Sequence, residues 1–131
     1  MKQQLLHIAL VVKDYDEAID FYTHKLNFDL VEDTKQSEHK RWVIVRPKGT
    51  EGCSILLAKG ANDFQKSRIG NQTGGRVFLF LYTDNFERDH QNLIKQKIKI
   101  IRAPSHEAYG TVLVFEDLYG NLWDLIEPKE N

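Results

Sequence analysis

The sequence predicts an α+β fold in which two βαβββ modules follow one another along the chain. Three observations support this prediction. Apolar runs of strand length, rich in Val, Leu and Phe, alternate with stretches of turn-forming residues. Two segments place apolar residues at helical spacing, and each segment opens with Asp followed three positions later by Glu. The second of these signals, at Asp84 and Glu87, follows the first, at Asp14 and Glu17, by 70 residues.

The first module is predicted within residues 1–59. Residues 5–12 form a nearly all-apolar run, typical of a central strand, which is interrupted by His7. Asp14 is placed to cap a helix that ends just before Asn27. Three further strands are expected at residues 28–32, 41–46 and 54–59, with a polar loop at 33–40.

Residues 60–75 are polar and rich in glycine, and they are predicted to connect the first module to a second one at 76–128. Together the two modules are expected to form a single domain that takes up the whole chain. The first elements expected in the second module are a strand at 76–83, a helix capped by Asp84, a strand at 98–102 that Pro104 ends, and a loop at 105–109.

The last part of the chain predicts a β-hairpin. Two β-rich runs, at 111–116 and 122–127, flank a five-residue connection that contains Asp, Gly and Asn. Strand alternation places Asp124 on one face with Leu122 and Ile126. A carboxylate between apolar neighbours needs a charged partner, a hydrogen bond or a metal ion. The turn or an arginine could supply that partner, but the position of Asp124 in the middle of a strand favours a ligand-binding cleft.

Size, charge and composition restrict the function. With 131 residues, a hydrophobic fraction of 41% and a net charge of −1, the chain is expected to form a globular core and to bind no nucleic acid. Its single cysteine cannot form an internal disulfide, and the apolar run near the N-terminus is too short to span a membrane. We therefore expect a cytoplasmic protein. The sequence lacks the P-loop, dinucleotide-binding, zinc-protease and α/β-hydrolase motifs.

Two motifs within this repeated order resemble a known family. The first is Asp-x-x-Glu-Ala-x-x-Phe-Tyr at residues 14–22, which follows His7, and the second is Asp-x-x-Gly-Asn-x-x-Asp-Leu at residues 117–125. Together they resemble the vicinal oxygen chelate superfamily, which includes glyoxalase I, bleomycin-resistance proteins and extradiol dioxygenases, over essentially the whole chain. The resemblance implies that each module curls into half of an open barrel. Two halves, from one chain or from two, would enclose a cleft in which a metal ion holds two substrate oxygens.

Carried over residue by residue, the metal positions of this family fall on His7, Leu56, Val77 and Asp124. Leu56 and Val77 cannot bind a metal and would instead contact the substrate. His7 and Asp124 suit zinc, iron, manganese or nickel. The resemblance therefore implies either one divalent metal ion with an incomplete ligand set or no metal. A third ligand could come from a loop, from His39, His106 or Glu107.

The remaining candidates rest on strand and loop positions. Without a metal, His7 and Asp124 could act as an acid–base pair, because imidazole exchanges protons near neutral pH. His7 could equally be a core residue with a satisfied ring nitrogen. Tyr109, in the loop before a strand, could donate a hydrogen bond across the mouth of a cleft or lie at its rim. Arg41, on the same face as Val43, could bind an anionic substrate or remain solvated at the strand end.

These residues support two main hypotheses. The first is a glyoxalase- or dioxygenase-like enzyme, a lyase or an oxygenase of unassigned reaction, whose small substrate binds in the cleft. The second is a metal-free protein of the bleomycin-resistance type that binds or sequesters a drug. A third possibility is that side chains fill the cleft and that the protein acts through its surface. In each case we expect a homodimer, because a curled sheet with an apolar concave face needs a cover.

Overall fold

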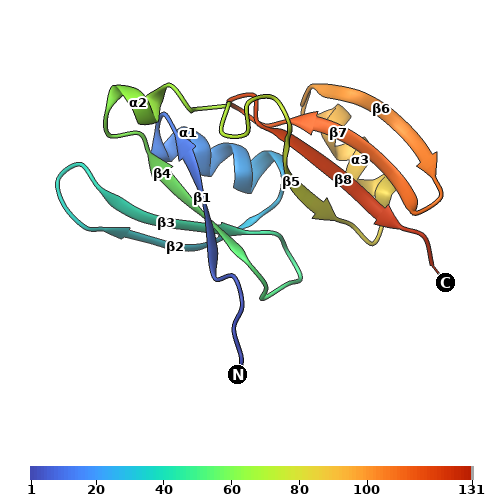
Figure 1. The fold of residues 1–131 in the computed structure, drawn as a ribbon, viewed down its shortest axis with the longest axis horizontal. Coiled ribbons are helices and arrows are strands. Elements are labelled where there is room, and N and C mark those ends of the chain that lie inside the picture. Colours follow the sequence, from blue (N-terminus) through green and yellow to red (C-terminus); the bar gives the residue numbers. More distant parts are fainter. Residues whose placement is uncertain (131) are drawn as a thin grey trace. The chain divides into compact units, whose positions relative to one another are not determined.

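A computed structural model describes residues 1–130 of the chain. The chain divides into two compact units, Met1–Ile69 (unit 1) and Gly70–Asn131 (unit 2). Each unit contains one four-stranded sheet and one main helix, in the order βαβββ (Figure 1). The predicted fold class and the duplicated order are therefore confirmed. Within residues 1–130, no helix is long and apolar enough to cross a membrane.

Unit 1 contains a mixed sheet with the strand order β1-β4-β3-β2. Strand β1 runs parallel to β4, whereas β4 and β3, and β3 and β2, pair in antiparallel fashion. Its elements are β1 (His7–Val12), α1 (Tyr15–Asp20), a π-helical turn (Phe21–Lys25), β2 (Asp29–Lys35), β3 (Arg41–Arg46), β4 (Ser54–Lys59) and α2 (Asp63–Lys66). The short helix α2 lies inside the connector that was predicted at 60–75.

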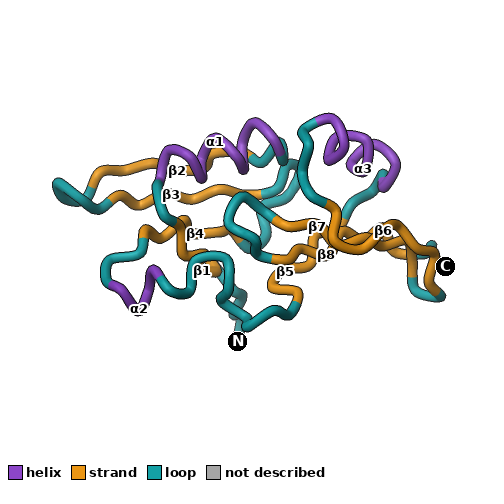
Figure 2. Tube along the Cα trace, turned by 90° about the horizontal axis from the view of Figure 1, so that it is seen from above, coloured by secondary structure: helices purple, strands orange, loops and turns teal. Residues whose placement is uncertain are grey.

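Helix α1 begins where the sequence predicts, but it ends at Asp20, and the π-helical turn continues the helical segment to Lys25, where the helix was expected to end. Asp14 caps it, because the Asp14 carboxylate accepts a hydrogen bond of 2.8 Å from the backbone N–H of Glu17. Asn27, with φ of 60°, adopts the left-handed conformation that stops a helix. The helix covers one face of the sheet, as Figure 2 shows. The strand side chains beneath it are completely buried, namely Leu10, Val12, Val43, Val45 and Leu57.

Strand β2 is longer than predicted. The residues expected to begin a loop pair with β3 instead, since Asp33 lies opposite Val43 and Lys35 lies opposite Arg41. β2 is an edge strand and all of its residues are exposed, so its polar side chains remain in water while its backbone is paired. A polar sequence therefore indicated a loop where the structure has an edge strand.

Unit 2 repeats this arrangement with the strand order β5-β8-β7-β6, and β5 runs parallel to β8. The predicted closing hairpin is confirmed as β7 and β8. The elements of the unit are β5 (Val77–Tyr82), α3 (Phe86–Lys95), β6 (Ile100–Glu107), β7 (Gly110–Glu116) and β8 (Leu122–Pro128). Helix α3 covers one face of this sheet, where Trp123 stacks on Phe115 with ring centroids 6.0 Å apart.

Two predictions for unit 2 are wrong in detail. Asn85, and not Asp84, caps α3, because its side chain accepts a hydrogen bond of 3.1 Å from the N–H of Arg88. Strand β6 also continues through Pro104 to Glu107. β6 is an edge strand whose register shifts between Arg102 and Ser105, and a proline is tolerated at such an irregular edge because no ladder hydrogen bond is lost.

The turn between β7 and β8 is organised around a buried carboxylate. Asp117 is 4% exposed, and it accepts hydrogen bonds from the backbone N–H groups of Tyr119 and Asn121 and from the Asn121 side-chain amide. The carbonyl of Tyr119 is also packed tightly against Gly70, where a Cβ atom would stand 1.9 Å from the Tyr119 oxygen. This turn fixes where β8 begins and therefore which face Asp124 occupies.

Candidate functional site

Each sheet has one face that its own helix covers and a second face that carries no helix of the same unit, which we call the helix-free face. In unit 1, strand alternation and pairing place His7, Ala9, Trp42, Ile44 and Leu56 on this face. In unit 2 they place Phe80, Tyr82, Arg102, Val112, Val114, Asp124 and Ile126 on it. Both predicted polar candidates, His7 and Asp124, therefore lie on helix-free faces.

On the helix-free face of unit 1, His7 is half-buried and lies edge-on to Trp42. Their ring centroids are 6.0 Å apart, and the ring planes meet at 73°. The Nδ1 atom of His7 is buried and has no hydrogen-bond partner among residues 1–130. Ser54, which pairs with His7 in β4, is buried and carries a hydroxyl, but no hydrogen bond joins it to this nitrogen. This buried nitrogen is therefore left unsatisfied, which is uncommon in native proteins.

On the helix-free face of unit 2, Asp124 lies between Phe80 of β5 and Val114 of β7, and Arg102 of β6 follows Val114 in the same row. The Oδ1 atom of Asp124 is buried and has no hydrogen-bond partner within the described part of the chain. Burial raises the pKa of the Asp124 carboxyl above its usual value, and the positive charge of Arg102 only partly opposes that shift.

Two aromatic side chains stand beside Asp124 on the same face. Phe80 is 70% exposed and Tyr82 is 66% exposed, although both belong to a strand whose sequence is almost entirely apolar. The sequence predicted this strand but did not single out either residue as part of a site. A continuous apolar run does not distinguish a strand covered on both faces from one that presents its aromatic rings on an edge.

The donor set does not fit a chelated metal ion. Leu56 and Val77 occupy two of the four implied ligand positions, which leaves one implied ligand in each unit, His7 in unit 1 and Asp124 in unit 2. No group of three or more His, Cys, Asp and Glu side chains in residues 1–130 is arranged to hold a metal. His106, one of the loop candidates, instead contacts the Thr111 hydroxyl at 3.0 Å.

Arg41 and Val43 belong to the helix-covered side of unit 1. Arg41 binds Asp33 at 2.7 Å and Asp16 at 2.9 Å, and its guanidinium lies over the ring of Tyr15 at 5.2 Å. The hydrogen bond from Arg41 holds the pKa of Asp33 below its usual value. Val43 is completely buried, so neither side chain is available to an anionic ligand in this structure.

Tyr109 is 59% exposed, at the turn between β6 and β7. The next residue, Gly110, pairs with Pro128, whereas Val114 pairs with Asp124. Tyr109 is therefore at least four residues along the sheet from Asp124, which corresponds to roughly 13 Å. The structure does not bring these two predicted catalytic side chains together.

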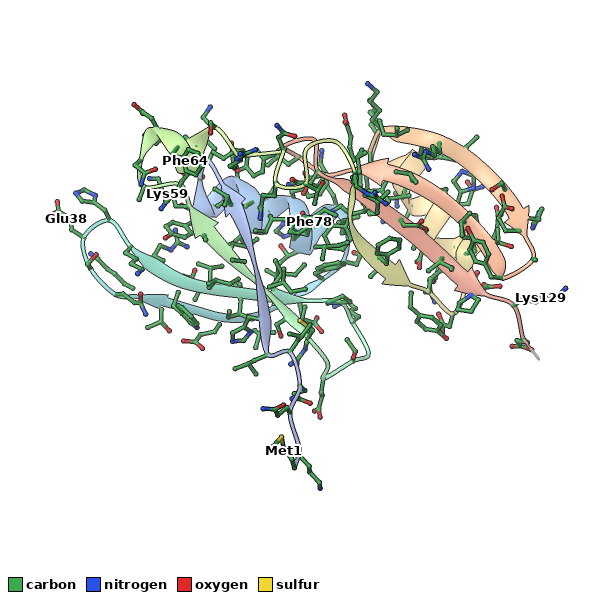
Figure 3. The ribbon with its side chains drawn as sticks, in the orientation of Figure 1. Met1, Glu38, Lys59, Phe64, Phe78 and Lys129 are labelled. Carbon is green, nitrogen blue, oxygen red and sulfur yellow. The ribbon has the colours of Figure 1, made fainter. Side chains whose placement is uncertain are left out.

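Unit 2 also contains a cavity of about 600 Å³ at the end of its sheet, which lies within the usual size range of small-molecule sites. Lys129, labelled in Figure 3 just beyond β8, is one of its lining residues. The others are Tyr82, Asp84, His106, Glu107, Gly110, Thr111, Glu127, Pro128 and Glu130. Asp124 does not line this cavity. This cavity is not recognisable in the sequence, because four separate segments form its walls.

Comparison with known proteins identifies relatives along the whole chain. An uncharacterized protein of Shewanella frigidimarina is 61% identical over 131 residues, which cover 99% of this chain and 97% of that protein. The crystal structure of UcmS2 has a TM-score of 0.85 at 26% identity and covers 97% of this chain and 99% of its own. TnmS3, an antibiotic-binding protein from Streptomyces sp. CB03234, has a TM-score of 0.80 at 27% identity, with 98% of each chain covered.

A sequence model of one family matches residues 4–125, which is nearly the entire chain. These likenesses support a role in binding or converting a small molecule. The match also agrees with the βαβββ repeat and with the motifs at residues 14–22 and 117–125. The chain belongs to the Glyoxalase/Bleomycin resistance protein/Dioxygenase superfamily.

Proposed function

We propose that this protein binds a small, largely apolar organic molecule against a helix-free face of one of its sheets, without chelating a metal. One observation supports this most strongly. Each helix-free face is mainly apolar or aromatic, and each carries one buried side-chain atom without a hydrogen-bond partner, namely His7 Nδ1 in unit 1 and Asp124 Oδ1 in unit 2. Burying a polar atom without a partner costs free energy, which a ligand group that bonds to it would recover.

Likeness to TnmS3 supports the same function. That protein binds an antibiotic, and it matches this chain from end to end at 27% identity. Binding without a chelate agrees with the apolar residues Leu56 and Val77 at implied metal positions. The proposal is therefore a drug-binding or sequestering role of the bleomycin-resistance type. We further propose that the two modules act as one domain, in a homodimer that covers exposed apolar side chains such as Phe80, and that the protein is cytoplasmic.

Screening for thermal stabilisation tests the proposed function. The protein would be heated with individual hydrophobic antibiotics in buffer that contains a chelator. A ligand present at about 100 times its Kd should stabilise the folded state by about 2.7 kcal/mol. Phe80→Ala should weaken the stabilisation, since the exposed ring lies on the helix-free face of unit 2.

Phe64→Ala is the matched control for this screen. Phe64, labelled in Figure 3, is 73% exposed, but it belongs to α2 and not to either helix-free face. This variant should keep the ligand response of the wild type. Two outcomes would contradict metal-free binding on these faces. One is an equal loss of ligand-induced stabilisation in the two variants, and the other is stabilisation that occurs only when the chelator is left out of the buffer.

An enzyme is the second candidate, and the environment of Asp124 favours it. Because burial raises its pKa, this carboxyl holds a proton more strongly than an exposed one and could serve as a general acid toward a ligand on the helix-free face of unit 2. A lyase- or dioxygenase-like enzyme that uses a metal predicts near-stoichiometric transition metal in the purified protein and its loss in His7→Ala. Substoichiometric metal that is unchanged by His7→Ala would remove the metal-dependent version.

A further inference from the structure

Asp124 indicates what kind of molecule the helix-free face of unit 2 would take. We infer that the ligand has a flat aromatic portion, which lies beside Phe80 and Tyr82, and an N–H or O–H group, which it donates to the carboxyl of Asp124. This inference rests on the proposed function, because it specifies the ligand class for the same face. Asp124 would therefore select ligands that carry a hydrogen-bond donor, whereas the family resemblance implies a metal ligand at this position.

Geometry along the sheet supports this assignment. Phe80, Asp124, Val114 and Arg102 form one row across four neighbouring strands. Adjacent strands are about 4.8 Å apart, so the exposed ring of Phe80 is close enough for one small molecule to touch both the ring and the carboxyl. On the other side of the carboxyl, Val114 is 4% exposed and offers no side-chain donor. A donor for Asp124 must therefore come from outside this row.

Arg102 does not serve as that donor. It lies two strands from Asp124, about 10 Å across the sheet. No hydrogen bond satisfies Asp124 Oδ1 in the described residues. Burial raises the pKa of the Asp124 carboxyl and the positive charge of Arg102 partly opposes that shift, but the carboxyl can accept a hydrogen bond whether or not it is protonated.

A ligand can reach this carboxyl even though Oδ1 is buried. Asp124 as a whole is only half-buried. Rotation about the Cβ–Cγ bond of a carboxyl group is soft and roughly two-fold, so a half-turn exchanges the two oxygens and brings Oδ1 to the surface. An aromatic molecule without a donor would cover the carboxyl and leave it unsatisfied, which lowers affinity.

Indole and N-methylindole provide a matched pair of probes, because they share the ring system and differ in one N–H donor. Their affinities would be measured by following the backbone amide signals of the full chain in an NMR titration. Wild-type protein should bind indole about tenfold more tightly than N-methylindole, with shifts at Phe80 and Tyr82. In Asp124→Leu, which replaces the carboxyl by an apolar side chain of similar size, the preference should disappear.

Asp124→Asn is the second variant, since it keeps one acceptor oxygen and should retain part of the preference for indole. Comparing the ratio of affinities between variants removes the steric effect of the added methyl group. Equal binding of both probes to the wild-type face would overturn this inference and leave the proposed function standing. If neither probe shifts Phe80, Tyr82 or, on the helix-free face of unit 1, Trp42 at millimolar concentration, the proposed function fails as well.

Discussion

The two units have the same order of elements, but their last two strands are joined in different ways. In unit 1 the connection between β3 and β4 is held by local contacts such as the hydrogen bond of 3.0 Å from the N–H of Gly52 to the hydroxyl of the exposed residue Thr50. In unit 2 the corresponding connection closes around the buried carboxylate of Asp117. The topology therefore does not require a specific turn. Unit 2 has a rigid one, and that turn sets the register of the strand that carries Asp124.

The helix-free faces differ as well. In unit 1 the unsatisfied atom belongs to a histidine that packs edge-on against Trp42, whereas in unit 2 it belongs to a carboxyl group between an exposed ring and a buried valine. One face thus combines an imidazole with a large aromatic surface, and the other combines an acceptor with two accessible aromatic rings. The repeat preserves the backbone, while the chemistry of each face has become specific.

The largest expected effect comes from the turns. Asp117→Ala should lower the free energy of unfolding by roughly 3 kcal/mol, because it leaves several buried donors without an acceptor. Thr50→Ala in the corresponding turn of unit 1 should change it by less than about 0.5 kcal/mol, because that hydroxyl is exposed. Urea unfolding of both variants measures the difference. Similar losses would mean that the two turns contribute equally.

A glycine pair sharpens the same comparison. Gly70→Ala should cost about 2–3 kcal/mol, because the new Cβ would collide with the carbonyl of Tyr119 and the residue has a φ of +76°. Gly74→Ala has a similar φ of +68° but meets nothing within 4 Å, so it should cost only about 1 kcal/mol. Thermal unfolding of the two variants separates the collision from the backbone strain. Equal costs would show that the contact with Tyr119 is unimportant.

The helix caps should have the next largest effect on stability. Asp14→Ala in unit 1 and Asn85→Ala in unit 2 should each destabilise the protein by about 1 kcal/mol, because each removes the side-chain acceptor of a backbone N–H in the first turn of a helix. Asp84→Ala should cost less, since it removes only the exposed ion pair with Arg88. Unfolding in urea distinguishes them. A larger loss for Asp84→Ala than for Asn85→Ala would contradict the cap that the structure assigns.

The smallest expected effect is a change in stability with pH, and this change should have opposite signs for a carboxyl group in unit 1 and one in unit 2. Because the pKa of Asp124 is raised above 3.8 by burial, wild-type stability is lost as pH rises through that raised value. Asp124→Asn should therefore gain stability relative to the wild type between about pH 3 and pH 7. The hydrogen bond from Arg41 lowers the pKa of Asp33. The contribution of Asp33 to the stability of the folded state is therefore present above pH 3.8 and is lost on acidification.

Asp33→Asn should accordingly lose stability relative to the wild type over the same rise in pH. Urea unfolding at several pH values measures both differences. Parallel trends in Asp33→Asn and Asp124→Asn would contradict the opposite environments that the structure gives these two carboxyl groups.

The parts of the fold that the sequence predicts are those that depend on residues close together in the chain. Hydrophobic periodicity and the capping pattern at Asp14 depend on neighbouring residues, so they place the strands and α1 correctly. Edge strands are harder, because water can surround their side chains while their backbone is paired. This is why β2 extends beyond the predicted loop boundary and why β6 passes through Pro104. The adjacent residues Asp84 and Asn85 can both cap a helix, and sequence alone does not decide between them.

The candidate site is predictable only in part. His7 and Asp124 are recognisable because each is a polar residue in an apolar strand, and the structure leaves one atom of each without a partner. Alternation groups residues by face but does not say which face meets a helix, so it could not reveal that Val43 is buried. The exposure of Phe80 depends on strand order, which no short stretch of sequence encodes.

A crystal structure of the protein with a stabilising antibiotic, grown in the presence of a chelator, tests metal-free binding on the helix-free faces most directly. We predict ligand density against a helix-free face, beside Phe80 with a donor group on Asp124 or beside Trp42 with a polar group on His7. We also predict no anomalous signal from a metal at either residue. Ligand density confined to the cavity beside Lys129, or a metal ion joining the ligand to His7 or Asp124, would contradict metal-free binding on these faces.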